Sequence, residues 1–412
     1  MNTRARIAAL LFTSLIILAS QISIPFAFAP SLTNTIVSSG AVVYPRAWAN
    51  DLVVYPYTIT DALAAFIGSH FNLVDFDFGA TVGFQKIKAA NPSITMIGYY
   101  SIYSTATYQP DWSTINANES WFLHDSSNGK RLQDSGGSYM MDFSNAGWRN
   151  HVATWCANQL ATYPMVDGIF ADNAQEAIIF TWGNPFYETS GTNLVSCPIA
   201  NVSPQAIVTN WNTYMIQLIQ AIKSAIGNKL LIINSPDLNG LLVQYCDGQM
   251  IEHFLHRIYL APNDWSTSNP IDEMALLDKL SATGKVVMAF SGATIPQNPT
   301  STDIALTHQC MLYCLSGFLL AYNGKASFGF QMLQYDYTGH NSYWSDMDAP
   351  IGAPVSARYN VQGSLWARDF ANGKVFLNID DSATYTVSVG GTVYNVSPRS
   401  GLIVSSSGLI AS

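Results

Sequence analysis

The sequence predicts a (β/α)8 barrel followed by a small C-terminal antiparallel β domain. Between about residues 41 and 350, eight short apolar runs alternate with seven segments in which apolar residues recur every three or four positions. After about residue 355 the pattern changes to short alternating runs with glycine-containing turns. Eight βα units over about 300 residues fit the usual size of this barrel. An open doubly wound sheet is the alternative, since strand order cannot be deduced from these runs.

The expected elements follow one another in a regular order. The runs predicted to be buried parallel strands are residues 41–45, 73–78, 94–102, 166–172, 230–235, 249–254, 285–291 and 326–331. The segments predicted to be helices are residues 60–71, 84–90, 146–163, 204–226, 238–246, 271–283 and 303–322. Residues 103–142 form an insertion after the third strand, in which 121–123 and 138–143 are expected to pair across a glycine-rich turn. In the C-terminal part we expect strands at 363–369, 374–379, 385–389 and 392–396.

The N-terminus has the pattern of an export signal. Two arginines precede an apolar run at residues 7–18, and Ala27 and Ala29 form a small-x-small cleavage site. We therefore expect a signal peptide or N-terminal anchor at residues 1–29, a linker at 30–40, the barrel at 41–350 and the β domain at 355–412. The protein should be secreted, and a membrane is expected as a partner only if the N-terminal segment stays uncleaved. No later stretch is expected to be long and apolar enough to span a bilayer.

Composition excludes several classes of function. Charged residues are only 11% of the 412 residues, and 18 Lys and Arg stand against 27 Asp and Glu, with no basic stripe. Nucleic-acid binding is therefore not expected. The 12% of aromatic residues suits a carbohydrate-binding cleft, although aromatic side chains also fill ordinary cores. Three acceptor sequons, at Asn118, Asn201 and Asn395, fit an exported glycoprotein. The five cysteines leave at least one thiol unpaired.

Two carboxylic acids lie at the positions where a barrel of this kind has its active site. Asp172 and Glu252 each come at the end of a strand-like run, and these strand ends face the active site of the barrel. A carboxylate in such a place is costly unless it is paired, hydrogen-bonded or functional. Two of them on facing strands suit cleavage of a glycosidic bond, in which one protonates the leaving oxygen and the other attacks the sugar or activates water. The alternative is a structural role in capping the loops.

Other polar residues near strand ends could bind sugar hydroxyls. The candidates are Asp77 after the second strand, Tyr100 in the third, Asp142 at the end of the insertion, Asn173 beside the first acid and Asn234 at the end of the fifth strand. Asp142 directly precedes a helix start, so capping of that helix is an alternative role.

Neither a metal nor a cofactor is expected. His253 and His256 lie close to Glu252 and could bind a metal, but no third ligand is evident, and good metal sites need three or four. Ser235 and Ser291 lack the pattern of a strained nucleophile elbow. Cys197 and Cys246 lack a clear His and Asn arrangement for thiol catalysis. A metal-dependent hydrolase that uses the two histidines stays an open alternative.

Two segments carry a resemblance to a known family. Residues 139–149 (YMMDFSNAGWR), followed by 166–173 (VDGIFADN), resemble the glycoside-hydrolase-like (β/α)8-barrel family related to α-galactosidase-type and polygalactosaminidase-type glycosidases. Residues 366–378 and 400–403 are similar to the β domain that ends such enzymes. The resemblance spans about residues 40–405. It implies a poly- or oligosaccharide substrate and a retaining mechanism, with Asp172 as nucleophile and Glu252 as acid/base.

A fold of this kind does not by itself establish an activity. A non-catalytic carbohydrate-binding or cell-surface protein built on the same barrel is therefore the alternative function. The two hypotheses differ in whether any sugar is released. They also differ in whether the replacement of Asp172 by asparagine abolishes an activity or leaves binding nearly unchanged.

Overall fold

The computed structural model describes residues 47–49, 59–78, 81–176, 186–190, 193–235, 240–266, 269–322, 326–333 and 343–412. The expected signal segment 1–29, the linker 30–40 and the first expected strand at 41–45 lie outside these residues. The chain divides into two compact units. The smaller unit contains Ser104–Asp142 and Ile178–Thr209, and the larger unit contains the barrel and the C-terminal sheet.

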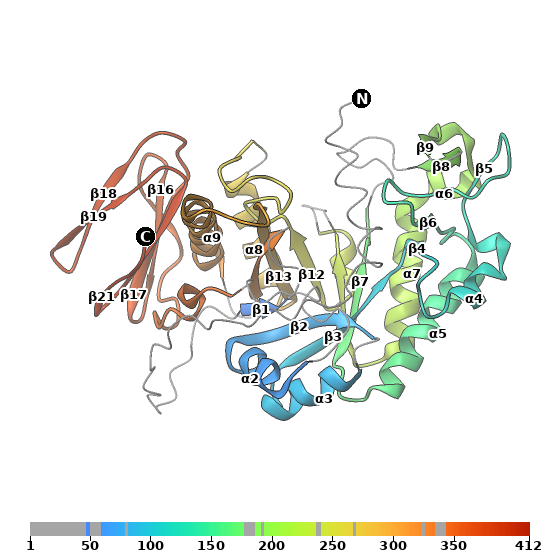
Figure 1. Cartoon of the computed structure of the whole chain (residues 1–412), viewed down its shortest axis with the longest axis horizontal. Coiled ribbons are helices and arrows are strands. Elements are labelled where there is room, and N and C mark those ends of the chain that lie inside the picture. The colour runs from blue at the N-terminus through green and yellow to red at the C-terminus, as the bar shows by residue number, and fades with distance from the viewer. Residues whose placement is uncertain are drawn as a thin grey trace. The chain divides into compact units, whose positions relative to one another are not determined.

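Eight parallel strands close into a barrel in the larger unit (Figure 1). The strands are β1 (Ala47–Ala49), β2 (Phe71–Asp77), β3 (Thr95–Ser101), β7 (Gly168–Asp172), β11 (Leu230–Asn234), β12 (Gly248–Glu252), β13 (Val286–Thr294) and β14 (Ala326–Leu333). They follow one another around the ring in chain order, and β1 pairs with both β2 and β14. The barrel predicted from the alternating runs is therefore confirmed.

Helices connect successive strands of the barrel. They are α2 (Asp61–His70), α3 (Thr81–Ala90), α5 (Ala146–Thr162), α7 (Trp211–Ile226), the short η4 (Leu242–Tyr245), α8 (Pro270–Ala282) and α9 (Ser301–Ala321). The first turns of α5 and α9 have side-chain caps: Asn145 accepts from Gly147 N, and Thr300 forms a capping box with Asp303. Two expectations were wrong. The helix expected at 204–226 is split into α6 (Gln205–Thr209) and α7, and the one expected at 238–246 is only η4 within the described residues.

The interior of the barrel is packed by alternate residues of the strands. The buried cluster consists of Leu73, Ile97, Phe170, Ile232, Met250, Ile258, Met288 and Phe290. Side chains two residues apart on a strand share a face. Asp172 follows Phe170 by two residues and Glu252 follows Met250 by two, so both acids continue this inward row toward the carboxyl ends of their strands.

The opposite ends of the same strands are fastened by a lysine–aspartate arrangement that occurs twice. In the first, Asp167 Oδ2 accepts hydrogen bonds from Met96 N and from Lys88 Nζ, each at 2.8 Å. Lys88 Nζ also donates to Ile94 O at 2.6 Å. We call this arrangement a Lys–Asp clamp. It ties the start of β7 to the start of β3 and to helix α3.

The second Lys–Asp clamp repeats the first, two βα units further around the barrel. Asp247 Oδ2 accepts from Leu231 N at 2.8 Å and from Lys223 Nζ at 2.7 Å, and Lys223 Nζ donates to Lys229 O at 2.8 Å. In both clamps the lysine precedes the carbonyl that it contacts by six residues and the fastened N–H by eight. Similar backbone geometry therefore underlies both.

A glycine follows each clamp aspartate because the neighbouring strand is close. A Cβ atom on Gly168 would lie 2.3 Å from Leu230 O, and one on Gly248 would lie 2.4 Å from Val286 O. Neither contact could be relieved by moving a side chain, since both involve backbone oxygen. The Asp–Gly pair at the start of β7 and of β12 is thus dictated by the packing of the strands.

The C-terminal part forms the expected antiparallel structure. A five-stranded sheet has the order β15 (Tyr359–Gln362), β16 (Leu365–Phe370), β17 (Gly373–Asn378), β20 (Ser400–Ser405), β21 (Gly408–Ala411). A separate hairpin joins β18 (Tyr385–Val389) to β19 (Thr392–Val396). Its turn places Gly390 and Gly391 at φ +58° and +83°, a conformation that glycine adopts without strain.

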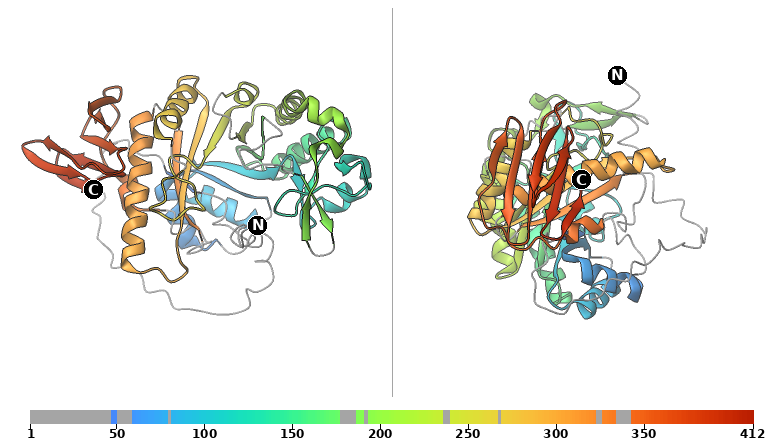
Figure 2. Two further views of the ribbon diagram at one scale, coloured as in Figure 1. Left: turned by 90° about the horizontal axis from the view of Figure 1, so that it is seen from above. Right: turned by 90° about the vertical axis from the view of Figure 1, so that its left-hand side faces the viewer.

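Helix α9 lies between the barrel and this sheet, in contact with β13 and β14 on one side and with β17 and β20 on the other (Figure 2). The buried Arg368 of β16 donates to Leu319 O, Leu320 O and Tyr322 O, so one guanidinium satisfies carbonyl groups at the end of the helix. Gly401 allows the closest approach, because a Cβ there would lie 2.0 Å from Ser316 Oγ.

Helix α9 contradicts the expectation that no stretch after the N-terminal segment is long and apolar enough to span a bilayer. Within the described residues it is the one helix that is long and apolar enough to cross a membrane by length and composition alone. However, 72% of the relevant window is buried inside the protein. Cys310 and Cys314 belong to this buried helix, and all five cysteines are buried. The apolar surface of the helix is therefore part of the protein core.

The smaller unit consists of short elements. The paired segments expected at 121–123 and 138–143 do meet, through Leu123 N to Met140 O at 2.9 Å and Asp142 N to Trp121 O at 2.7 Å. They do not form a regular ladder, since Trp121 ends the 3-10 helix η2 (Glu119–Trp121) and β6 (Tyr139–Met140) pairs with β4 (Ser104–Thr105) instead. The remaining pairs are β5 (His124–Asp125) with β10 (Val202–Ser203) and β8 (Tyr187–Ser190) with β9 (Asn193–Ser196).

Candidate active site

The two strand-end acids meet at a single amide group. Asn234 ends β11, the strand between β7 and β12, and its Nδ2 donates to Asp172 Oδ1 and to Glu252 Oε2, each at 2.9 Å. An amide nitrogen carries two hydrogens and can serve two acceptors. Because both carboxylate oxygens are 2.9 Å from one nitrogen, they are at most about 5.8 Å apart, near the separation of about 5 to 5.5 Å that retaining glycosidases show.

Asp172 is surrounded by hydrogen-bond donors. Its Oδ2 accepts from Tyr99 OH at 2.8 Å and from Asn173 Nδ2 at 2.9 Å, and its Oδ1 accepts from Asn173 N at 2.8 Å. Asn173 has φ +64°, a left-handed conformation in which asparagine is enriched. Burial and the charge of Glu252 raise the pKa of Asp172, whereas the hydrogen bonds from Asn234 and Tyr99 oppose this rise. The donors thus favour the ionised form in a site that otherwise disfavours it.

Glu252 has a different environment. Its one described hydrogen bond is to Asn234, and burial raises its pKa while that bond lowers it. Even so, 38% of its side chain remains accessible to solvent, so the loss of hydration is incomplete and a ligand can reach the carboxyl group. Two neighbouring carboxyl groups repel each other when both are ionised, so the pair retains a proton to higher pH than either acid would alone.

The turn that follows Glu252 has a strained backbone. His253 and Leu255 have φ +66° and +59°, which costs non-glycine residues about 1–2 kcal/mol each. The turn is fixed by Leu255 N donating to Glu273 Oε2 at 2.5 Å and by Phe254 N donating to Phe290 O at 2.7 Å. Strain that is held in this way is typical of functional sites.

The two histidines after the acid do not converge on a common point. His253 Nε2 lies 2.7 Å from Tyr259 OH and 3.6 Å from Glu252 Oε1, whereas His256 Nδ1 lies 2.7 Å from Gly292 O. Burial lowers the pKa of His253 to about 3, so the imidazole is neutral. Within the described residues, no three His, Cys, Asp or Glu side chains come together in a way that could hold a metal ion.

The other residues predicted to bind sugar hydroxyls lie in different environments. Asn173 and Asn234 lie at the site, but their amide groups hold the carboxylates rather than facing outward. Asp77 ends β2 in register with Tyr99, and its side chain lies outside the described part of the structure. Asp142 belongs to the smaller unit and is buried there.

The structure corrects the expectation that Tyr100 could bind a sugar hydroxyl. It is 2% exposed, and its ring lies 4.2 Å from that of Trp155 in α5, on the side of β3 that faces the helices. Its neighbour Tyr99 packs against the interior cluster and reaches Asp172. The sequence placed a tyrosine at this strand end correctly, but alternation along the strand selects Tyr99 rather than Tyr100.

Sequence reasoning also missed a signal that marks both acid-bearing strands. Residues 167–172 read DGIFAD and residues 247–252 read DGQMIE. In each case the clamp aspartate directly precedes the strand, its glycine begins the strand, and the candidate acid, five residues after the clamp aspartate, ends it. An odd spacing puts the two acids of a strand on opposite faces, so only the second belongs to the inward row.

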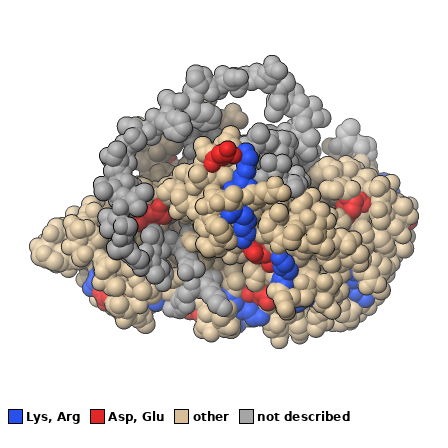
Figure 3. All heavy atoms as spheres, turned by 90° about the horizontal axis from the view of Figure 1, so that it is seen from below, with Lys and Arg blue, Asp and Glu red and all other residues tan. Residues whose placement is uncertain are grey.

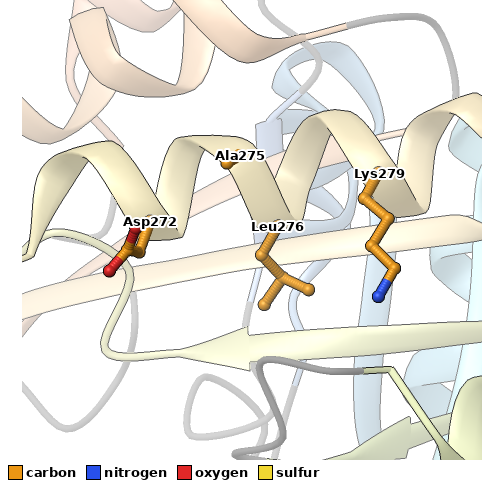
Figure 4. A pocket seen from close by; sticks show the side chains of 4 residues that line it. All are labelled: Asp272, Ala275, Leu276 and Lys279. Carbon is orange, nitrogen blue, oxygen red and sulfur yellow. The ribbon is translucent and has the colours of Figure 1, made fainter.

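A hollow on the surface of α8 is a separate feature. It has a volume of about 300 Å³ and is lined by Asp272, Ala275, Leu276 and Lys279, all of the same helix (Figure 4). None of the residues around Asp172 and Glu252 contributes to it. The chemistry of the carboxyl pair therefore does not involve this hollow.

One family profile matches most of this chain, and several solved structures are similar to it. The family profile described as hypothetical glycosyl hydrolase family 15 matches residues 88–374. No curated protein matches the chain. Similar solved structures include Ega3 of Aspergillus fumigatus in complex with galactosamine (12% identity, TM-score 0.43, covering 74% of this chain and 98% of that one). They also include the glycoside hydrolase domain of PelA from Pseudomonas aeruginosa (14%, 0.43, covering 72% and 97%). A third is the α-galactosidase TtGalA of Thermus thermophilus (11%, 0.42, covering 80% and 65%).

Proposed function

We propose a specific reaction for this chain, which belongs to hypothetical glycosyl hydrolase family 15 and is a glycosidase. The proposal is that it cleaves O-glycosidic bonds of a poly- or oligosaccharide with retention of anomeric configuration. Asp172 is the nucleophile and Glu252 the acid/base. The observation that carries this proposal is the shared amide of Asn234, which limits the distance between the two carboxylate oxygens to about 5.8 Å.

The assignment of roles rests on the hydrogen bonds. Asp172 accepts four, from Tyr99, Asn234 and both nitrogens of Asn173, and donors to a carboxylate favour its ionised form. Glu252 accepts one described hydrogen bond and is the more accessible of the two. The proton that the pair retains is therefore best placed on Glu252, which suits a general acid.

The reaction then proceeds in two steps. A carboxylate oxygen of Asp172 attacks the anomeric carbon while the carboxylic proton of Glu252 passes to the glycosidic oxygen, whose bond to that carbon breaks. A glycosyl ester of Asp172 results. Glu252, now ionised, takes a proton from water as the water oxygen attacks the anomeric carbon and displaces Asp172. One water molecule is consumed for each bond cleaved, and both carboxyl groups return to their initial states.

The place of action is part of the same proposal. We expect the chain to be exported through residues 1–29 and to meet its substrate outside the cell. Sequencing of the N-terminus of the protein recovered from the culture medium tests this expectation. Recovery of the intact chain only inside the cell would contradict it.

The catalytic proposal is tested with the purified full chain on a panel of neutral, acidic and amino-sugar polysaccharides. Release of reducing ends identifies a substrate, and proton NMR of the first product shows whether configuration is retained. Asp172→Asn and Glu252→Gln should each lower kcat by about 10³-fold or more. Asp61→Asn is the matched control, since this side chain is 91% exposed on α2. Inversion of configuration, or full activity in Asp172→Asn, would refute the proposal.

A further inference from the structure

Glu252 presents its two oxygen atoms to different neighbours. Oε2 is held by Asn234 on the side of Asp172. Oε1 lies 3.6 Å from His253 Nε2, which in turn lies 2.7 Å from the Tyr259 hydroxyl. Since both distances are measured from one nitrogen, the Tyr259 oxygen is at most about 6.3 Å from Glu252 Oε1. The reaction described above assigns nothing to His253 or Tyr259.

His253 is built to hold Tyr259 in place. Its left-handed backbone directs the ring, which meets the Tyr259 ring edge-on with centroids 4.7 Å apart. Its side chain is 16% exposed, and within the described residues its Nδ1 is buried without a hydrogen-bond partner, so Nε2 makes its polar contacts. The neutral imidazole therefore acts through a hydrogen bond and not as a counter-ion to Glu252.

Tyr259 in contrast reaches solvent, since it is 41% exposed. The general acid of a glycosidase protonates the oxygen that leaves with the departing sugar. Groups around the nucleophile therefore face the sugar that becomes attached, and groups beyond the acid face the sugar that departs. A tyrosine offers a ring that can pack on the C–H face of a sugar and a hydroxyl that can bond to its polar edge.

We propose that Tyr259, positioned by His253, contacts the leaving-group sugar and so makes the enzyme selective for bonds in which a further sugar follows the one attacked. This inference rests on the proposed function, because it takes Glu252 as the acid. It names the substrate class as a chain of at least two sugars, one on each side of the cleaved bond, rather than a sugar joined to a small non-sugar group.

The experiment compares two leaving groups on the same attacked sugar. One substrate is an oligosaccharide of the polysaccharide that the wild-type chain degrades, and the other is the 2,4-dinitrophenyl glycoside, whose leaving group needs neither a proton nor a sugar contact. Tyr259→Ala should lower kcat/KM about 10- to 100-fold on the oligosaccharide, the range expected for loss of one pocket contact, and less than about threefold on the dinitrophenyl glycoside. Tyr259→Phe and His253→Gln should show the same selectivity to a smaller extent.

A matched control is Tyr359→Ala, since Tyr359 is 37% exposed on β15 and should change neither rate. The proposal is overturned if Tyr259→Ala slows both substrates equally or slows neither. If Tyr259→Ala does not fold, Tyr259→Phe decides in the same way. Glu252→Gln tests the underlying reaction separately, because it should abolish cleavage of the oligosaccharide and spare the first step on the dinitrophenyl glycoside. A Glu252→Gln chain that cleaves both substrates at the wild-type rate refutes the reaction and the subsite with it.

Discussion

Asn234 is the residue that couples the two halves of the candidate site, because its one amide nitrogen contacts both carboxyl groups. An amide is uncharged, so it orients the two acids without fixing either in the ionised form, as a lysine in its place would. It is 8% exposed and is held at the end of a buried strand. The proposed division of roles between Asp172 and Glu252 thus depends on a neutral donor.

Replacement of Asn234 by alanine should separate the two acids. The hydrogen bond from Asn234 lowers the pKa of Asp172 and of Glu252, so its loss should raise both. Because the nucleophile must be ionised, the acidic limb of the pH–rate profile should move to higher pH, and kcat should fall about 10²-fold. Measurement of kcat/KM against pH checks this. An unshifted acidic limb would show that Asn234 does not govern the acids.

A pair of adjacent tyrosines tests the assignment on β3. Tyr99→Phe removes the hydroxyl that donates to Asp172 and keeps the ring in the interior cluster, so activity should fall about 10-fold or more while stability changes by less than about 1.5 kcal/mol. Tyr100→Phe, on the helix-facing side, should leave kcat within about threefold of wild type. If Tyr100→Phe lowered kcat more than Tyr99→Phe did, Tyr100 and not Tyr99 would belong to the site.

At the scale of elements, β7 and β12 share the same arrangement of residues. Each follows directly on a clamp aspartate, begins with a glycine and ends with a candidate acid, and each clamp aspartate is paired with a lysine of a preceding helix. The base of the strand therefore carries interactions that stabilise the fold, and the other end carries the candidate acid. The turn after β12 adds a third feature, since Glu273 binds its strained backbone.

The Lys–Asp clamps should contribute to stability and not to catalysis. Asp247→Asn and Asp167→Asn each leave a lysine without its ion pair and weaken the bond to a backbone N–H. Both aspartates are about one-third exposed, which limits the expected loss to about 1–2 kcal/mol for each variant. Urea unfolding measures the loss, and kcat of the folded variants should stay unchanged. A fall in kcat at equal stability would contradict this separation.

Glu273 should make stability depend on pH in one direction. Burial raises its pKa from 4.5 to about 7, so between these values the folded chain binds more protons than the unfolded chain. Stability should therefore decrease as pH rises from about 4.5 to about 7, by on the order of 3 kcal/mol at most from this residue. Glu273→Gln keeps an acceptor for Leu255 N and should reduce the decrease. Melting temperatures at pH 4.5 and pH 8 check this, with Asp61→Asn as the control that should follow wild type.

At the scale of the whole molecule, charge is sparse and locally balanced. Figure 3 shows a face on which acidic and basic side chains alternate within one band while most of the surrounding surface is uncharged. Some ion pairs join segments that are far apart in sequence or belong to different helices, as Arg358 with Asp278 and Lys86 with Asp61 do. With only 11% charged residues, apolar contacts such as those of α9 must provide most of the cohesion of the larger unit.

The contact between α9 and the C-terminal sheet should be sensitive to a single methyl group. Gly401→Ala would place a Cβ 2.4 Å from Leu312 O and 2.0 Å from Ser316 Oγ, so the strand and the helix would have to separate. Overpacking of this kind costs about 1–3 kcal/mol. Gly390→Ala, where nothing lies within 4 Å, should cost only about 1 kcal/mol of backbone strain. Thermal unfolding of the two variants compares them, and equal losses would mean that the contact is loose.

Much of this arrangement was accessible from the sequence because it depends on periodicity. The alternation of apolar runs and helical segments predicted the closed barrel, and the strand-end positions of Asp172 and Glu252 follow from the same pattern. The choice between Tyr99 and Tyr100 failed because it depends on which parity of β3 faces inward, and an apolar strand covered on both faces does not reveal this. The contact of His253 with Tyr259 depends on two left-handed residues that no sequence pattern specifies.

The two Lys–Asp clamps have a consequence for how this chain could be remodelled. They share their internal spacing, although the connection from β3 to β7 carries residues 104–142 of the smaller unit, whereas the helical element in the described residues of the connection from β11 to β12 is η4. Connections of different length at the carboxyl ends of these strands therefore leave the clamps at the opposite ends unchanged, and these connections are accordingly the place to graft foreign loops.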